Sequence, residues 1–223
     1  MLLLGLTGAG PGTGSRMAYA GIAYQPATGA WRRLPAITSL DEGNFEGGSD
    51  VVWAGSEALL AGLINGAYSP AADHWRRIAS GGLGSPAVTV WTGRQLLMWS
   101  GGCCGDDVAA GATYTAKTDR WERLPAMGTG RMWHSAVWTG RHLLVWGGRT
   151  FHAGAWTAPA HGLAYDPAAN RWSPLPKSPL RGRFGHVAVW TGTRMLIWGG
   201  HPARQTDPER PFTDGAAYTP YPL

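Results

Sequence analysis

Apolar residues along the chain gather in short runs separated by Gly- and Pro-containing turns, a pattern typical of β-strands. The clearest example, residues 131–172, reads RMWHSAVWTGRHLLVWGG and, after a loop, HGLAYDPAANRWSPLP. HSAVW and RHLLVW flank a Thr-Gly turn, which predicts a hairpin. The second run is apolar at successive positions, as expected of a strand covered on both faces, and GLAY and RWSPL predict two further strands. No segment shows sustained helical periodicity.

The same arrangement recurs along the chain, with three markers in a constant order. The first is a Tyr in a small-residue frame that precedes a Trp by seven residues: Tyr24 and Trp31, Tyr68 and Trp75, Tyr114 and Trp121, Tyr165 and Trp172, with Tyr218 alone at the end. The second is a Trp followed two residues later by Gly, at Trp53, Trp91, Trp138 and Trp190. The third is a Gly pair, at 101–102, 147–148 and 199–200. Successive tyrosines are 44, 46, 51 and 53 residues apart, a period typical of propeller blades.

These markers resemble those of the kelch-repeat family, in particular a bacterial variety with Trp-Thr-Gly turns, and the resemblance covers nearly the entire chain. All three coincide in the units around Trp121 and Trp172. The resemblance implies an all-β, kelch-type β-propeller with four-stranded antiparallel blades around a central channel. We therefore predict one propeller domain over residues 1–223, with about three complete blades and two partial ones. The approximate bounds are 1–35 (partial), 46–80, 84–125, 131–176 and 183–223 (partial).

The two terminal units depart from the repeat. The first lacks an innermost strand because the chain opens directly in LLLGL, and the last ends at Tyr218 without a Trp strand. Propellers normally close their sheet edges, because exposed edges are prone to pair with other chains. The sequence therefore predicts a fragment of a larger ring, whose unclosed blade edges would permit self-association.

Composition supports an all-β protein and narrows the range of partners. The 223 residues are 44% hydrophobic and include 34 Gly and 13 Trp, as expected of a core with many tight turns. The net charge of +5 is scattered along the chain, so we expect no nucleic-acid partner. We also expect no membrane partner, because no run is long enough to span a bilayer. The apolar start is too short for a signal peptide, which leaves the compartment open, since an exported parent protein with a missing N-terminus would give the same sequence.

The two cysteines, Cys103 and Cys104, are adjacent in the sequence. Neighbouring cysteines close only a strained, very short ring. We interpret them as two loop thiols, and a redox-active vicinal disulfide is the alternative.

Candidate ligand-binding residues lie where the repeat varies, because variable loops on a rigid scaffold commonly carry binding sites. The loop after the Gly pair and the loop that enters each inner strand both vary, and in an up-and-down blade both emerge on one face. The candidates on this face are Arg131, His134, Arg183 and His186 at the channel mouth, and Arg149, Phe151, His152, Trp156, His161, His201 and Arg204 in the long loops. The two Arg/His sets occupy equivalent positions, which favours a scaffold role for them over an anionic or sugar ligand.

His152, His161 and His201 fall in loops of neighbouring units, and three imidazoles could hold zinc or copper. Their spacing matches no ligand motif. We therefore interpret them as solvated loop histidines and predict neither a metal nor another cofactor.

No catalytic motif stands out: the chain has no Gly-x-Ser-x-Gly elbow, no His-Glu-x-x-His helix and no phosphate loop. The leading hypothesis is therefore a non-enzymatic binding scaffold for a protein or carbohydrate partner, with no catalytic residues. One alternative is an enzyme similar to the sialic-acid mutarotases, which would use Arg131, His134, Arg183 and His186. Another, a copper enzyme similar to galactose oxidase, would require a Tyr/His copper set with a cross-linkable cysteine, and no such set can be assigned.

Overall fold

The computed structural model describes residues 2–7, 18–38, 49–62, 64–83, 86–100, 110–128, 130–203 and 210–220. All regular secondary structure in these ranges is β-structure, and no helix within them is long and apolar enough to cross a membrane. This confirms the predicted all-β class. Cys103, Cys104 and Arg204, which carried sequence-based interpretations, lie outside the described residues.

Three consecutive four-stranded antiparallel sheets form the middle of the molecule, each with its strands in sequence order from the inner to the outer strand. The second sheet contains β5 (Ser49–Trp53), β6 (Ala58–Gly62), β7 (Gly66–Ser69) and β8 (His74–Arg77). The third contains β9 (Pro86–Trp91), β10 (Leu96–Ser100), β11 (Gly111–Thr115) and β12 (Arg120–Arg123). The fourth contains β13 (Ser135–Trp138), β14 (Leu143–Trp146), β17 (Gly162–Asp166) and β18 (Arg171–Pro174).

The two terminal sheets follow the same order but are incomplete in the described residues. The first sheet contains β1 (Leu2–Thr7), β2 (Ala18–Gln25) and β3 (Ala30–Arg33), and the short β4 (Ile37–Thr38) also pairs with β2. The fifth contains β19 (Val187–Trp190), β20 (Met195–Trp198) and β21 (Gly215–Tyr218). Among the described residues, no strand pairs with β1 on the side away from β2.

The fourth sheet confirms the hairpin that its sequence predicts. Trp138 pairs with Leu143 across the Trp-Thr-Gly turn, and Tyr165 pairs with Trp172. All four residues of β14 are buried, as expected of a strand covered on both faces. The segment after the Gly pair, expected to be a loop, instead contains a small hairpin of β15 (Thr150–His152) and β16 (Ala155–Thr157).

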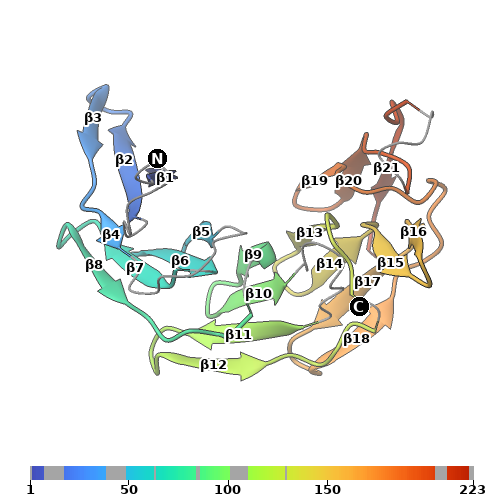
Figure 1. The fold of residues 1–223 in the computed structure, drawn as a ribbon, viewed down its shortest axis with the longest axis horizontal. Helices are drawn as coiled ribbons and strands as arrows, with labels where there is room; N and C mark the ends of the chain where they lie inside the picture. Colours follow the sequence, from blue (N-terminus) through green and yellow to red (C-terminus); the bar gives the residue numbers. More distant parts are fainter. Residues whose placement is uncertain are drawn as a thin grey trace.

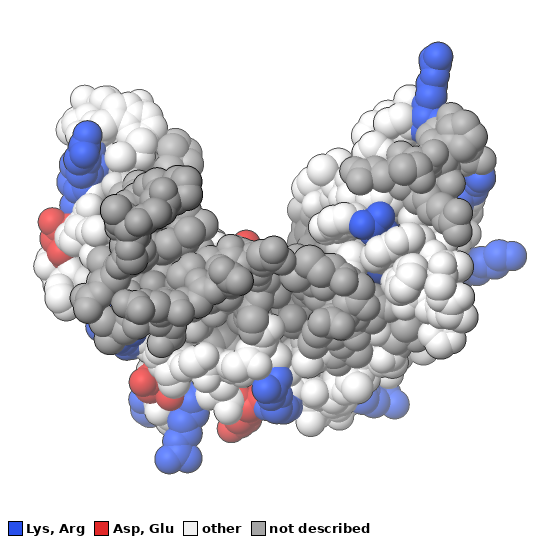
Figure 2. Space-filling model, viewed as in Figure 1, with Lys and Arg blue, Asp and Glu red and all other residues white. Residues whose placement is uncertain are grey.

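The sheets follow one another along an open arc, with the first sheet at one end and the fifth at the other (Figure 1). Neighbouring sheets pack face to face. Between the fourth and fifth sheets, for example, Leu144 and Trp146 share a buried cluster with Met195 and Ile197. On the face seen in Figure 2, the described Lys and Arg side chains are dispersed along the margin of the arc.

Indole side chains of the outer strands tie each sheet to the preceding one. The indole nitrogens of Trp75, Trp121 and Trp172 donate hydrogen bonds to the carbonyl oxygens of Pro35 (2.9 Å), Ala79 (2.7 Å) and Pro125 (3.0 Å). These three tryptophans pack between sheets. The equivalent Trp31 does not pack in this way: its side chain is 53% exposed, and the described residues place no sheet before the first one.

Candidate functional site

The loops that vary between units emerge at one end of the sheets, as the sequence predicts. Ser135 pairs with Trp146, and Trp146 pairs with Gly162, so the entry to β13, the Gly pair after β14 and the entry to β17 lie together. We call this end of the sheets the loop face. The Trp-Thr-Gly turns and the Tyr-to-Trp turns lie at the opposite end, which we call the turn face.

Arg131 holds the loops of the fourth sheet together. Its side chain is 4% exposed and donates hydrogen bonds to the carbonyl oxygens of Gly147 (3.3 Å) and His161 (3.1 Å). Its other terminal nitrogen lies 3.2 Å from the imidazole of His161. Burial lowers the pKa of the Arg131 guanidinium. The polar atoms of this side chain thus serve protein carbonyls and a protein imidazole.

Arg183 holds the same place in the fifth sheet with a different partner. The side chain is fully buried and makes a two-pronged ion pair with the carboxylate of Asp214, at 2.7 and 3.2 Å, while also donating to the carbonyl of Gly199. The hydrogen bond from Arg183 holds the pKa of the Asp214 carboxyl below its usual range. Asp214 occupies the position of His161, one residue before the next strand. The buried arginine therefore binds the residue at this position in both repeats, as an ion pair in the fifth sheet and through a carbonyl and an imidazole in the fourth.

His134 and His186 are buried against the Gly pairs. A Cβ atom at Gly148 would lie 2.9 Å from the Cβ of His134, and one at Gly200 would lie 2.9 Å from the Cβ of His186. Gly148 and Gly200 also have φ values of 91° and 94°, a region that favours glycine, so both the backbone conformation and the close approach of the histidine require glycine there. Burial lowers the pKa of each imidazole to about 4, which keeps both rings neutral near pH 7.

One contact on the loop face has the geometry of a nucleophile and its base. The Ser135 hydroxyl lies 2.7 Å from Nε2 of His186. An activated serine, however, depends on a base that titrates near neutral pH and is oriented by a third group. The Nδ1 atom of His186 is buried without a hydrogen-bond partner. This pair therefore fits a structural hydrogen bond between the fourth and fifth sheets better than a catalytic dyad.

Three aromatic side chains, of which Trp133 is exposed and Phe184 buried, surround Arg149 on the loop face. The guanidinium carbon lies 3.8 Å from the ring centroid of Trp133, 4.0 Å from that of Trp156 and 4.7 Å from that of Phe184. Such stacking stabilises a cation by about 0.5–1 kcal/mol at an exposed site. Phe151 packs against Trp156 at 5.0 Å across the β15–β16 hairpin. We call Trp133, Arg149, Trp156 and Phe184 the aromatic–arginine cluster.

Arg149 carries a charge that the described part of the chain does not neutralise. No carboxylate pairs with it among the described residues, and its Nε atom is buried without a hydrogen-bond partner. Burial lowers the pKa of its guanidinium. The rings fix the guanidinium plane and leave an unpaired cation for an external acceptor, such as a carboxylate.

Trp133, which stacks on Arg149, has a left-handed backbone conformation. Its φ is 53°, a region that L-residues other than glycine rarely adopt, and its side chain is 49% exposed. At the equivalent position of the next unit the chain has Gly185, with φ 62°. The Trp133 carbonyl accepts a hydrogen bond from the Gly185 amide at 3.0 Å, which ties the two entry loops together.

The structure divides the candidate residues between the scaffold and the loop face, and the two Arg/His sets take the scaffold role that their equivalent positions favour. Arg131, His134, Arg183 and His186 are buried in the scaffold, whereas Arg149 and Trp156 belong to the aromatic–arginine cluster and Phe151 packs against Trp156. His161 contacts Arg131, His201 stacks on Phe184, and His152 is exposed on β15. No three metal-ligating side chains gather within the described ranges, and these histidines in particular do not.

Sequence reasoning missed Trp133 and Phe184 as members of the site. Both lie in the entry loops beside His134 and His186, and the candidates named from the sequence in these loops were all titratable residues. The sequence does contain one sign of this site, because Trp133 aligns with Gly185. A large residue at a position where the neighbouring repeat has glycine indicates a strained backbone, and strained residues are concentrated at functional sites.

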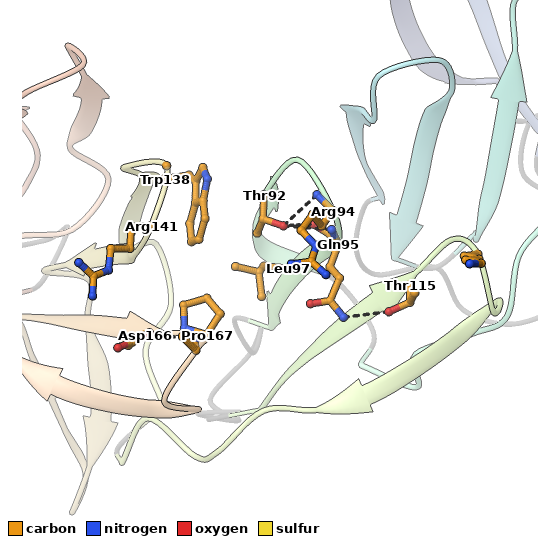
Figure 3. A pocket seen from close by; sticks show the side chains of 12 residues that line it. Thr92, Arg94, Gln95, Leu97, Thr115, Trp138, Arg141, Asp166 and Pro167 are labelled. Atoms are coloured by element: carbon orange, nitrogen blue, oxygen red, sulfur yellow. Dashed lines mark hydrogen bonds between the residues drawn. The ribbon is translucent and has the colours of Figure 1, made fainter.

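A second candidate site is a groove on the turn face, between the third and fourth sheets (Figure 3). It has a volume of about 720 Å³ and is lined by Arg94, Lys117 and Arg141 together with Asp166 and Trp138. Gln95 donates a 2.9 Å hydrogen bond to Thr115 across one wall. Sequence reasoning assigned these turns to the scaffold and therefore did not anticipate the groove.

The groove coincides with the loss of a repeated contact between sheets. Arg32 donates to the Tyr68 hydroxyl of the next sheet at 2.6 Å, and Arg76 likewise hydrogen-bonds to Tyr114. In the third sheet the residue equivalent to Arg32 and Arg76 is Glu122, whose side chain has no N–H group to donate to Tyr165. The Tyr165 hydroxyl donates to Asn170 within its own sheet at 2.8 Å, as Tyr68 and Tyr114 donate to Asp73 and Asp119 within theirs. The groove is thus a variation in sheet packing, and one of its cations, Arg141, already interacts electrostatically with Asp166.

A comparison of the sequence with models of known protein families finds no match.

Proposed function

We propose that this chain is a kelch-type β-propeller module without enzymatic activity, whose loop face binds a protein or carbohydrate partner. The propeller assignment is supported by the repeated markers and by antiparallel sheets that follow one another along an arc. A rigid repeat that carries variable loops on one face is suited to binding. One observation carries the binding proposal: Arg149 stacks on the exposed Trp133 without a carboxylate partner among the described residues.

The chemistry of the aromatic–arginine cluster defines the partner group. Exposed Trp and Arg side chains are over-represented among residues that dominate binding energy at interfaces. The indole of Trp133 provides a flat apolar surface, and Arg149 provides a cation already desolvated on its faces. A ligand that places an anionic group beside a flat apolar surface satisfies both.

The enzymatic alternatives have less support. A mutarotase-type enzyme would need Arg131, His134, Arg183 and His186 to reach a ligand, but each of these side chains is at most 7% exposed. For a copper enzyme similar to galactose oxidase, Cys103 and Cys104 lie outside the described residues. Turnover of a sugar that is lost in the His134→Ala and His186→Ala variants, with the fold retained, would overturn the non-enzymatic proposal.

The binding proposal is tested by screening the purified chain against glycan and peptide arrays and measuring the dissociation constant of each hit. Trp133→Ala and Arg149→Ala should each weaken binding at least about tenfold, which corresponds to about 1.4 kcal/mol. The matched control is Trp53→Ala, because Trp53 is 51% exposed at the turn-face end of β5. Hits that bind both loop-face variants as tightly as the unaltered chain would contradict the proposal.

A further inference from the structure

The outer face of the fifth sheet exposes side chains at positions that the fourth sheet buries. The equivalent positions, with their exposed fractions, are Val137 (7%) and Val189 (57%), Leu144 (1%) and Leu196 (42%), and Trp146 (3%) and Trp198 (60%). The residue types are the same at all three positions, so the sequence of the fifth sheet is that of a packed sheet. An exposed apolar face of this kind marks an interaction surface.

The interior of the molecule shows what covers such a face. On the fourth sheet, Leu144 and Trp146 are covered by Met195 and Ile197 from the second strand of the fifth sheet. One sheet earlier, Leu97 and Trp99 share a buried cluster with Leu143 and Val145 from the second strand of the fourth. The occupant in each case is the next sheet of the same repeat.

The first sheet carries the opposite half of this interface. Trp31 is 53% exposed, whereas the equivalent Trp75 is 8% exposed because it packs against the preceding sheet and donates to the carbonyl of Pro35. Ile22 on β2 is 39% exposed. Figure 1 places the first and fifth sheets at opposite ends of the arc, so neither covers the other within one chain.

We infer that the outer face of the fifth sheet binds the first sheet of a second copy of this chain. Both halves of one repeated interface are present on the same chain, which makes a second copy the partner that fits. The contact is head-to-tail, so it generates a closed ring where the rotation closes and an open string of molecules where it does not. It uses the two ends of the arc and is independent of the aromatic–arginine cluster.

The test measures the molar mass of the chain by sedimentation velocity over a range of concentrations. The unaltered chain should exceed the mass of one molecule, and increasingly so as concentration rises. Trp198→Glu and Trp31→Glu each remove one half of the interface, so each variant alone should sediment as a single molecule. An equimolar mixture of the two retains one intact interface per pair, and it should form a species of twice the monomer mass.

A matched control and a measurement of folding keep the outcomes distinct. Trp53→Glu changes a tryptophan of similar exposure at the turn-face end of β5, in the second sheet, and this variant should assemble like the unaltered chain. Circular dichroism should show the same β-structure in all variants, since each substituted side chain is about half exposed. Three results would overturn the inference: an unaltered chain that stays monomeric at every concentration, self-association of Trp31→Glu as strong as that of the unaltered chain, or a mixture that remains monomeric.

Discussion

Trp133 and Gly185 hold the same left-handed backbone conformation at equivalent positions of neighbouring repeats, with φ values of 53° and 62°. Glycine adopts this conformation without a steric penalty, whereas a side chain with a Cβ atom costs about 1–2 kcal/mol there. The conformation holds the Trp133 indole under the Arg149 guanidinium with half of its surface exposed. Strained backbone conformations are concentrated at functional sites, where they persist although they lower stability. An exposed tryptophan with a strained φ fits this pattern.

Replacing Trp133 should therefore separate stability from binding. We expect Trp133→Gly to have a higher free energy of unfolding than Trp133→Ala, by about 1 kcal/mol, because only glycine relieves the strained φ. At Trp53, in the strand β5, the order should reverse, with Gly less stable than Ala by about 0.5–1 kcal/mol. Urea denaturation of the four variants measures both differences, and the same order at both positions would contradict the strain argument.

A glycine of a Trp-Thr-Gly turn and a glycine of a Gly pair allow the cost of backbone conformation and the cost of close packing to be measured separately. Gly140 and Gly200 both have φ 94°, but a Cβ atom at Gly140 would meet open space and one at Gly200 would lie 2.9 Å from His186 and from the Phe184 carbonyl. Gly140→Ala should lower the free energy of unfolding by about 1–2 kcal/mol through conformation alone. Gly200→Ala should lower it by a further ~1–3 kcal/mol through overpacking. Equal losses of unfolding free energy in the two variants would show that the close approach of Gly200 to His186 does not restrict the residue at position 200.

The fold was predictable because its signals are local and repeated. The Thr-Gly turns, the apolar second strands and the Tyr–Trp spacing predicted the hairpin between β13 and β14 and the strands β17 and β18. The β15–β16 hairpin was not expected, because three-residue strands leave too little alternation to read from one sequence.

The candidate site was less predictable, because sequence does not show which way a side chain points. Arg131 and Arg183 were candidates for a ligand site, although their equivalent positions favoured a scaffold role. The loops around them turn carbonyl groups inward, and both guanidinium groups bind these carbonyls. Arg149 was a candidate on equal terms with them, yet it lies among rings instead of carbonyls. The rings come from three separate segments, which only the folded chain brings together.

The indole groups between the sheets should dominate stability where they are covered. Trp75→Ala should lower the free energy of unfolding by about 3–5 kcal/mol, because it empties a buried site and leaves the Pro35 carbonyl without its donor. Trp31→Ala, at the equivalent but exposed position, should lower it by less than about 1 kcal/mol. Thermal or urea unfolding at concentrations where the chain is monomeric provides the comparison. Similar losses at the two positions would contradict the assigned role of the Pro35 contact and its covering sheet.

The buried histidines should make the fold sensitive to mild acid. Burial lowers the pKa of His134 and of His186 from 6.5 to about 4, with the neighbouring arginines contributing in the same direction. The unfolded chain therefore binds protons that the folded chain excludes. Stability is fully present above about pH 6.5 and is lost as the pH falls toward 4. Asp214, whose pKa is lowered by Arg183, has the usual carboxyl sign and loses its contribution only at still lower pH.

We expect the free energy of unfolding to fall by about 4 kcal/mol between pH 7 and pH 5, about 2 kcal/mol for each histidine, at 1.36 kcal/mol per pKa unit. His186→Gln removes one of the two rings whose pKa is lowered to about 4 and keeps a polar group near Ser135. In this variant the fall should be smaller by about 2 kcal/mol, whatever its stability at pH 7. The remaining dependence comes from His134 and from His161, whose pKa is also lowered by burial and by Arg131. Urea denaturation of both proteins at pH 7, 6 and 5 measures the slope. An unaltered chain with equal stability at pH 7 and pH 5 would show that the two rings accept protons in the folded state, and the scaffold role assigned to them would then be wrong.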